Sequence, residues 1–266
     1  MGQLLQRLFG VLSIATPTAT LRIAKTGGRR MSIARNGGRH ASVRGARFLV
    51  VGDVHGCRDE LELLLAKAEY DETTTQLVLV GDLVNKGPSS AGVVRWCRER
   101  GALCVRGNHD DHAVDHWQKH FHLGLAVPGK YAYVKELSAA DGAWLEALPH
   151  TLSLPDVDAI VVHAGLAPDV PLDEQTPKHM TRMRSLSDGA PSDAPGAASW
   201  AATRTERPLV IFGHDAKRGL QVHANAVGLD TGCCYGKKLT ALRLAAGEPH
   251  AFVAVDALRE YAKPGG

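Results

Sequence analysis

Short apolar runs that end abruptly at a glycine, a carboxylate or a histidine are the feature that most constrains the fold of this chain. Five such runs occur, at residues 48–51, 77–80, 102–105, 159–162 and 209–212. Runs so short and rich in β-branched residues predict strands that are buried on both faces. Helical patterns lie between them, at 58–69, from Ser89 or Ser90 to Gly101, and at 139–148 behind a capping box that starts at Ser138. This alternation predicts an α/β fold whose first half is largely parallel.

Each apolar run is followed by a side chain that can bind a metal ion. In open α/β sheets the carboxyl ends of the strands meet at one crevice, so these side chains are expected to converge there. A single histidine or Asp-Gly pair after a strand is usually only a polar residue or a turn, but five strand ends of this kind favour a shared site. Carboxylates, an amide oxygen and imidazoles suit two divalent ions about 3.5–4 Å apart that share one carboxylate. The candidate ligands are Asp53, His55, Asp82, Asn108, His163 and His214.

The blocks that contain these residues resemble the signature blocks of the PPP-type metallophosphatases. They read GDVHG (52–56), GDLVNKG (81–87), GNHD (107–110), HAG (163–165) and GH (213–214). The tail LDTGCCYGKKLTALRL (229–244), with TRMR (181–184) before it, is similar to the bacterial diadenosine-tetraphosphatase group, and within it the chain resembles the ApaH-like phosphatases. The resemblance covers about residues 47–245. It implies a calcineurin-like fold, a layered α/β/β/α sandwich with the metal site at the carboxyl ends of the strands.

The resemblance also implies a role for each ligand. Asp53, His55 and Asp82 would hold the first ion, while Asp82, Asn108, His163 and His214 would hold the second, with Asp82 as the bridge. Manganese is the expected metal, and zinc, iron, cobalt and magnesium are alternatives because ligand softness does not separate them. Water between two such ions is deprotonated near neutral pH and can attack phosphorus. His109 would be the general acid that protonates the departing oxygen.

Two residues of the GDLVNKG block distinguish the chain from the protein phosphatases of the superfamily. Lys86 stands where those enzymes have arginine, and a fixed cation there would stabilise the charge of a phosphoryl group in transit; an ordinary solvated lysine is the alternative. Asn85 stands where they have the aspartate that pairs with the acid histidine. An amide cannot supply that charge, so Asp110, Asp111 or Asp215 is a candidate substitute, and the substitution favours phosphoanhydride substrates with good leaving groups.

Further candidates are less strongly indicated. Arg182 and Arg184 are expected to contact phosphate, on one face if their segment is extended and on diverging faces if it is helical. The histidines at 112, 116 and 120 recur on one helical face, as an exposed surface near the site or as a third metal site. Trp200 is either a core residue or a base-stacking platform, and Cys57 is expected to serve packing. Residues 187–199, rich in Pro, Ser and Gly, are expected to form a flexible loop or lid.

The basic charge of the chain is concentrated at its start. Residues 1–47 contain nine of the 31 basic residues and no acidic residue, so the remaining 22 basic residues face 28 acidic ones. We therefore divide the chain into a basic arm (1–46), a catalytic domain (47–257) and a C-terminal tail (258–266). The arm has the composition of a mitochondrial presequence, and a basic extension of a cytoplasmic protein is the alternative. No apolar stretch reaches the length of about 20 residues that spans a membrane.

Together these features predict a two-metal hydrolase of phosphoanhydride bonds. Its substrate would be a dinucleoside polyphosphate, inorganic polyphosphate or the 5′ cap of an RNA, the last being the only nucleic acid expected as a partner. A protein Ser/Thr phosphatase is the alternative. The acidic domain argues against long nucleic-acid tracks, which engage basic surfaces. The odd count of five cysteines in a chain of 266 residues argues against a disulfide framework.

Overall fold

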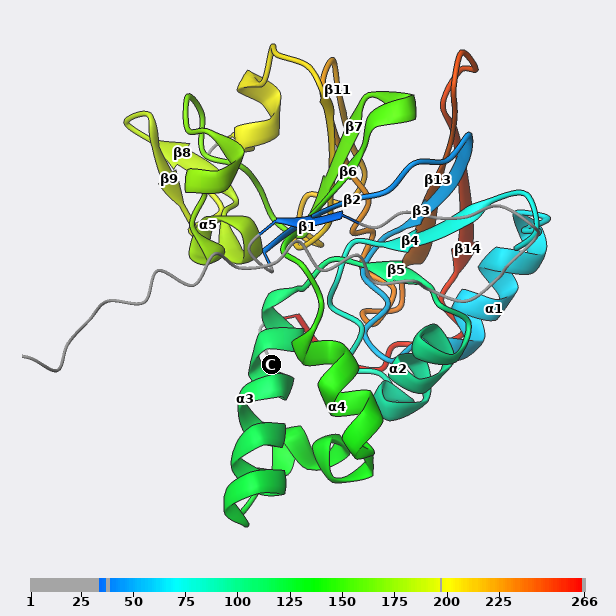
Figure 1. The fold of residues 1–266 in the computed structure, drawn as a ribbon, viewed down its shortest axis with the longest axis vertical. Helices are drawn as coiled ribbons and strands as arrows, with labels where there is room; N and C mark the ends of the chain where they lie inside the picture. The colour runs from blue at the N-terminus through cyan, green and yellow to red at the C-terminus, as the bar shows by residue number, and fades with distance from the viewer. Residues whose placement is uncertain (1–33, 37–38, 197, 265–266) are drawn as a thin grey trace, which may run out of the picture.

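The computed structural model describes residues 34–36, 39–196 and 198–264, which form two large sheets flanked by helices (Figure 1). The five-stranded sheet has the order β14-β13-β3-β4-β5, and the seven-stranded sheet the order β1-β2-β6-β7-β10-β12-β11. Strands of the first sheet are β3 (Arg47–Val51), β4 (Gln76–Leu79), β5 (Leu103–Cys104), β13 (Lys238–Ala245) and β14 (Ala251–Asp256). Those of the second are β1 (Ala34–Asn36), β2 (His40–Ser42), β6 (Thr151–Leu154), β7 (Ala159–Val162), β10 (Leu209–Phe212), β11 (Gln221–His223) and β12 (Ala226–Gly228).

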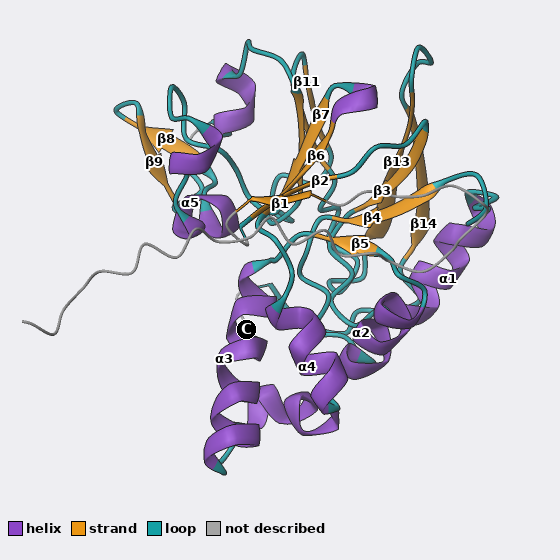
Figure 2. Cartoon of the chain, in the orientation of Figure 1, coloured by secondary structure: helices purple, strands orange, loops and turns teal. Residues whose placement is uncertain are grey.

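The helices separate into two groups (Figure 2). The larger group lies by the five-stranded sheet and comprises α1 (Arg58–Lys67), α2 (Ser90–Glu99), α3 (Asn108–Leu123), η1 (Gly129–Glu136) and α4 (Ala139–Glu146). The smaller group is α5 (Pro177–Arg182) with the 3₁₀ turn η4 (Trp200–Thr203), and two further 3₁₀ turns are η2 (Pro155–Val157) and η3 (Leu172–Glu174). The helices predicted at 58–69, from Ser90 and at 139–148 are all present, and Ser138 makes the predicted capping box with Asp141.

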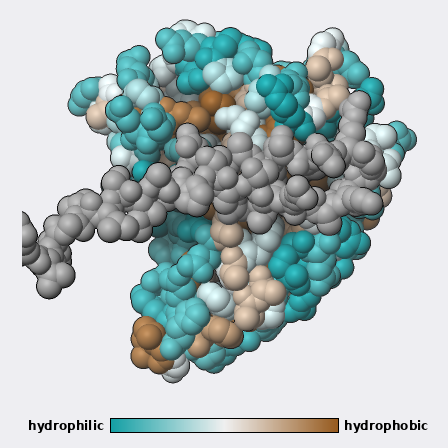
Figure 3. All heavy atoms as spheres, viewed as in Figure 1, coloured by the Kyte–Doolittle hydropathy of each residue, from teal (hydrophilic) through white to brown (hydrophobic). Residues whose placement is uncertain are grey.

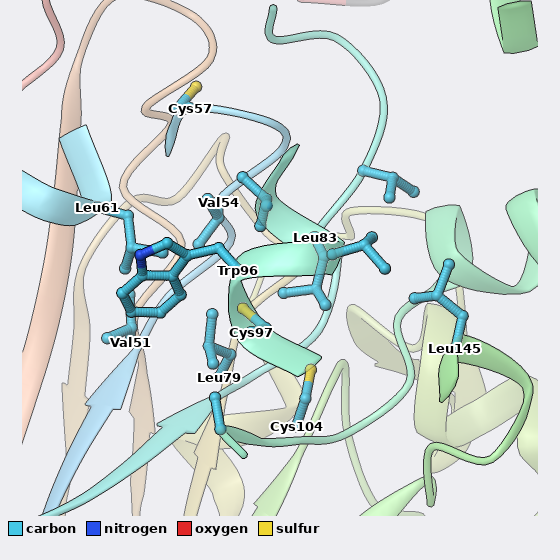
Figure 4. Packing of buried hydrophobic residues seen from close by; sticks show 14 of the residues in the cluster. Val51, Val54, Cys57, Leu61, Leu79, Leu83, Trp96, Cys97, Cys104 and Leu145 are labelled. Atoms are coloured by element: carbon cyan, nitrogen blue, oxygen red, sulfur yellow. The ribbon is translucent and has the colours of Figure 1, made fainter. Parts of the chain in front are cut away.

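Three apolar layers hold these elements together. Phe48 and Val78 of one sheet pack against Val161 and Ile211 of the other, so the two sheets are stacked face to face. The outer face of the five-stranded sheet is covered by α1 and α2, where Figure 4 shows Val51, Leu79, Leu61 and Trp96 gathered in one cluster. Met180 and Trp200 cover the outer face of the seven-stranded sheet. The layered α/β/β/α sandwich is therefore confirmed, and Trp200 belongs to its core.

Strand direction brings the predicted ligand loops together. Strands β3, β4 and β5 are mutually parallel, and β10 is parallel to both β7 and β12. The carboxyl ends of the two parallel sets face the same edge of the sandwich, because the site side chains that follow them are in contact, as described below. The predicted crevice is thus formed jointly by two sheets rather than by one.

The predicted domain boundaries need correction at both ends. Strand β2 pairs with β6, and Val43, which is fully buried, donates its N–H to Ser153. The domain therefore includes residues before 47, because the edge of the second sheet is completed by this segment. At the other end, residues 258–264 pack back onto the domain instead of forming a separate tail. Most of the predicted basic arm, residues 1–33 and 37–38, lies outside the described residues.

The loop predicted at 187–199 begins as an ordered hairpin. Strands β8 (Ser185–Ser187) and β9 (Ala190–Ser192) pair antiparallel around Asp188-Gly189, both with positive φ. Asp-Gly is the pair that a two-residue hairpin turn with two positive φ angles requires. This part of the segment is therefore a β-hairpin rather than the predicted irregular loop.

Three further properties complete the description. Within the described ranges, no helix is both long enough and apolar enough to cross a membrane. The tip of α3 and the residues after it expose Phe121, Leu123 and Leu125, in the region of the brown atoms at the lower end of Figure 3. All five cysteines are buried and free, as expected for a chain without a disulfide framework.

Candidate active site

Asp82 lies at the centre of the site, directly after β4. The chain turns there with positive φ at Gly81 (97°) and at Asp82 itself (51°). The carboxylate of Asp110 holds this turn, because it accepts N–H groups from Asp82, Leu83 and Gly107. A left-handed conformation at a non-glycine residue is strained and persists only where the surroundings fix it.

The two oxygens of Asp82 face different histidines. Its Oδ2 lies 3.5 Å from Nε2 of His55, and its Oδ1 lies 3.5 Å from Nε2 of His163. Oδ1 also accepts the N–H of His109, while Nε2 of His109 lies 4.0 Å from Oδ2. One carboxylate thus stands between two separate groups of nitrogen ligands.

Both central histidines are oriented by their second ring nitrogen. Nδ1 of His55 donates to the carbonyl of Val84, and Nδ1 of His163 donates to that of Val80, each over 2.9 Å. The lone pair on each Nε2 therefore points into the site, which is the second-shell arrangement found around histidines that bind metals. Oδ1 of Asn108 lies 3.1 Å from Nε2 of His163, so the amide belongs to the same group.

Asp53 and His214 meet through the backbone. The N–H of His214 donates to both carboxylate oxygens of Asp53, at 3.2 and 3.1 Å. The His214 ring joins Asp82 and His163 in a buried group whose ligand atoms lie within 4.8 Å of one another. Gly213 is required here, because a Cβ at that position would overlap Oδ1 of Asp53. The six predicted ligands are therefore brought together by the fold.

The charge of the buried cluster calls for cations. Burial raises the pKa of Asp53 well above its usual range, and the nearby carboxylates of Asp230 and Asp82 raise it further. Burial also acts to raise the pKa of Asp82, but the imidazoles of His163, His109 and His55 outweigh it and hold that pKa below the usual range. Burial lowers the pKa of His55 to about 3, so its ring is neutral and available as a ligand. Three buried carboxylates beside the neutral ring of His55 fit divalent metal ions, whose positive charge would offset the charge of the carboxylates.

Lys86 points into the site. Its Nζ lies 2.9 Å from Nε2 of His55 and 5.1 Å from the centroid of the Tyr235 ring. The backbone at Asn85 and Lys86 has positive φ, 73° and 69°, which turns the ammonium toward the ligands. The interpretation of Lys86 as an ordinary solvated lysine is therefore wrong.

Asn85 is the partner of His109. Its Nδ2 lies 2.9 Å from Nδ1 of His109, and its Oδ1 accepts the N–H of Lys86 over 2.9 Å. Burial lowers the pKa of His109 to about 4. The three carboxylates considered as substitutes are engaged elsewhere: Asp110 with backbone N–H groups, Asp111 with Arg106, and Asp215 with Arg218.

The two predicted phosphate-binding arginines diverge. Arg182 ends α5, and its Nη2 lies 3.0 Å from Nε2 of His112, while its carbonyl lies 3.1 Å from Nε2 of His214. Arg184 lies beyond the helix and lines the active-site cavity. The histidines predicted to share one face of α3 do not gather at one point: His112 contacts Arg182, His116 packs on Tyr131, and His120 contacts the carbonyl of Leu125.

The ligands open into a cavity of about 490 Å³. Its wall contains the cations Lys86, Arg184, Lys217 and Lys237, together with Asp230 and Tyr235. Asp230 was missed as a site residue, although it ends an apolar run (226–229) in the same way as the predicted ligands do. Tyr235 was missed because a lone aromatic residue in a polar loop carries no distinguishing pattern.

Comparison with known proteins identifies the family. The calcineurin-like phosphoesterase family matches residues 46–243. A symmetrical bis(5′-nucleosyl)-tetraphosphatase of Nitrosospira multiformis is 30% identical over 73% of this chain and 91% of its own length. A crystal structure provisionally assigned as a diadenosine tetraphosphatase superposes with a TM-score of 0.73 at 34% identity, over 82% of this chain and 98% of that one.

A more distant likeness concerns the fold alone. A protein serine/threonine phosphatase from Saccharomyces cerevisiae superposes with a TM-score of 0.53 at 16% identity, over 80% of this chain and 81% of that one. The family predicted from the sequence blocks is confirmed by the family match and by the tetraphosphatase relatives. The chain belongs to the calcineurin-like phosphoesterase family and is a metal-dependent phosphohydrolase.

Proposed function

We propose that the chain hydrolyses phosphoanhydride bonds of dinucleoside polyphosphates. The observation that carries this proposal is the Asp82 carboxylate, whose two oxygens each face one histidine 3.5 Å away. A single carboxylate divided between two ligand groups is suited to bridge two cations. The substrate class is supported by relatives named symmetrical bis(5′-nucleosyl)-tetraphosphatase, about nine-tenths of whose length the chain covers.

In this proposal the ligands form two groups that share Asp82. Asp53, His55 and Asp82 would hold one divalent ion, and Asp82, Asn108, His163 and His214 would hold the other. Divalent ions bound by these residues would lower the pKa of water to about 7, so that hydroxide is available as the nucleophile at neutral pH. Manganese is the first candidate, with zinc, iron, cobalt and magnesium as alternatives.

The remaining groups of the chain act on the phosphates. Lys86 and Arg184 line the same cavity, so their charges can bind non-bridging oxygens and offset the negative charge that develops during phosphoryl transfer. Arg182, which ends α5 and contacts His112, orients its carbonyl toward His214 instead. We therefore assign phosphate binding to Arg184 and a positioning role to Arg182.

The tautomer of His109 supports an anhydride rather than an ester. Because Oδ1 of Asn85 accepts the N–H of Lys86, its Nδ2 faces His109 and donates to Nδ1. The neutral ring then carries its proton on Nε2, where it can donate a hydrogen bond to the leaving oxygen. A phosphate leaving group, whose second pKa is about 6, needs no full proton at neutral pH, whereas a serine alkoxide does.

A substrate panel tests the proposal. The purified chain with added MnCl₂ is assayed on diadenosine tetraphosphate, inorganic polyphosphate, capped RNA, a phosphoserine peptide and p-nitrophenyl phosphate. We expect the highest kcat/KM on diadenosine tetraphosphate. The values on polyphosphate and capped RNA, the other two phosphoanhydrides of the panel, should be lower. A higher value on the phosphoserine peptide would establish the protein phosphatase alternative, and equal slow rates on all five would contradict a dedicated substrate.

For location, we propose that the basic segment before the domain directs the chain to mitochondria. The support is compositional, since nine basic residues and no acidic residue occur in residues 1–47. Because β1 and β2 both belong to the second sheet, the segment to test is 1–33. A fluorescent reporter fused to residues 1–33 should enter mitochondria, while a cytoplasmic reporter would favour the alternative.

A further inference from the structure

The last described residues are hydrogen-bonded to α1 and to the loop that contains Tyr235. We name residues 258–264 the C-terminal strap. The carboxylate of Glu60 on α1, which is fully buried, accepts the N–H of Leu258 over 3.0 Å and the hydroxyl of Tyr261 over 2.8 Å. After β14, the strap therefore turns back toward α1 (Figure 1).

The strap also binds the loop that holds Lys86 in place. The N–H groups of Tyr261 and Ala262 both donate to the carbonyl of Cys234 over 3.0 Å, and Glu260 forms a β-bridge with Tyr235. Gly236 has φ of 75°, and a Cβ there would lie 3.2 Å from that of Glu260, so the two segments are in close contact. Tyr235 in turn lies under the ammonium of Lys86.

These anchors place Pro264 in the wall of the active-site cavity. The same wall contains Pro195, Ala216 and Tyr235, so apolar groups occur beside the cations that would bind phosphate. Inorganic polyphosphate has no apolar group that could pack against these side chains. A planar aromatic base can stack on a tyrosine or proline face while its phosphates reach the cations, and one stacked base strengthens binding by about 5- to 150-fold.

We infer that the strap and Tyr235 form a nucleobase subsite that gives the chain its preference for nucleotide-linked phosphoanhydrides over inorganic ones. This inference rests on the proposed function, because it names the part of the substrate beyond the scissile bond. The base lies against Tyr235, Pro264, Pro195 and Ala216, and the phosphates lie against Lys86 and Arg184. The strap thus contributes to substrate selection, while the metal ligands remain those described above.

Equilibrium binding separates this inference from the reaction itself. Isothermal titration of the manganese-loaded full chain compares ADP with inorganic pyrophosphate, which share a diphosphate and differ in the nucleoside. We expect ADP to bind at least about 10-fold more tightly, within the range of one stacked base. In a chain that ends at Ala262, which keeps every strap hydrogen bond described above, the ratio should fall about threefold or more while the affinity for pyrophosphate is unchanged.

Two point variants complete the test. Pro264→Gly in the full chain should weaken ADP binding alone, and Pro249→Gly, at an exposed proline in the turn between β13 and β14, should change neither ligand. Equal affinity of the full chain for ADP and pyrophosphate, or an equal loss of both in the shortened chain, would overturn the subsite. Absence of hydrolysis with the ADP preference intact would instead overturn the proposed reaction and leave the subsite standing.

Discussion

The amide of Asn85 donates a hydrogen bond to Nδ1 of His109 over 2.9 Å, and its orientation is fixed by the N–H of Lys86 at its other end. A neutral donor therefore occupies the place next to the imidazole where a carboxylate would stabilise an imidazolium ion. The arrangement keeps the proton of the neutral ring on Nε2, toward the site. It makes His109 a hydrogen-bond donor rather than a strong acid.

Asn85→Asp should shift the enzyme toward phosphate esters. The new carboxylate would favour the protonated ring and raise the pKa of His109 from its present value of about 4, so that the ring can transfer a proton to an alkoxide. We expect the ratio of kcat on a phosphoserine peptide to kcat on diadenosine tetraphosphate to rise about 10-fold or more. Adding His109→Asn to the variant should remove the gain. A gain that survives this second change would show that His109 does not donate the proton.

Asp82→Asn should cost the enzyme both its metal and its turnover. The amide keeps the size of the side chain but removes the negative charge that faces His55 and His163, so ligands on both sides lose their shared partner. Elemental analysis should show less metal bound per chain, and turnover should fall by more than about 100-fold. Asp115→Asn, an exposed carboxylate paired with Lys119, is the matched control and should retain metal and activity.

Gly213→Ala should disturb the site through sterics alone. A Cβ at residue 213 would overlap Oδ1 of Asp53, so the carboxylate must move from its position beside the His214 N–H. We expect metal affinity to fall about 10- to 100-fold in equilibrium dialysis, with an unfolding cost of about 1–3 kcal/mol. Gly129→Ala, where a Cβ would meet nothing within 4 Å, should leave both quantities unchanged. Unaltered metal affinity in Gly213→Ala would show that Asp53 is not a ligand.

Asp141 provides a test of stability against pH away from the metal site. Burial acts to raise its pKa, but hydrogen bonds from Ser138 and Arg98 outweigh burial and hold the pKa below its usual range. Because the folded pKa lies below the unfolded value of about 3.9, the stabilisation is present above about pH 4 and is lost as pH falls through the folded pKa.

Asp141→Asn should therefore destabilise the fold by about 1–3 kcal/mol at pH 7 in urea unfolding. The difference from the wild type should shrink as pH falls below about 4, since protonation removes the same charge from the wild type. Asp169→Asn, at a carboxylate in the exposed segment after β7, is the control and should show a smaller difference at neutral pH. A difference for Asp141→Asn that is constant with pH would contradict the assigned ion pair and cap.

The convergence of the six candidate ligands could be predicted because its signal is local. A buried strand that stops at Asp53, Asp82 or His163 is visible in a few consecutive residues, and strand direction then brings the strand ends to one place. The same rule applied to the run before Asp230 would have added that carboxylate. Gly213 and Gly107 could be seen as turns, but the close approach that requires a glycine at each position depends on the folded partner.

The missed features depend on contacts between distant segments. Strand β2 has only three residues, and its pairing with β6 joins positions more than 100 residues apart. The strap is held by one buried carboxylate and one carbonyl, Glu60 and Cys234, neither of which differs in sequence from an ordinary helix or loop residue. The directions of the Arg182 and Arg184 side chains could not be predicted, because they depend on the residue at which α5 ends.

The position of Pro264 has a practical consequence for anyone who prepares this enzyme. Whatever polypeptide is joined after that proline begins its path at the rim of the catalytic cavity. A purification tag fused there, especially a run of histidines, would compete for the very cations whose occupancy an assay is meant to report. Kinetic comparisons between laboratories will agree only when the affinity handle is placed elsewhere or cut away.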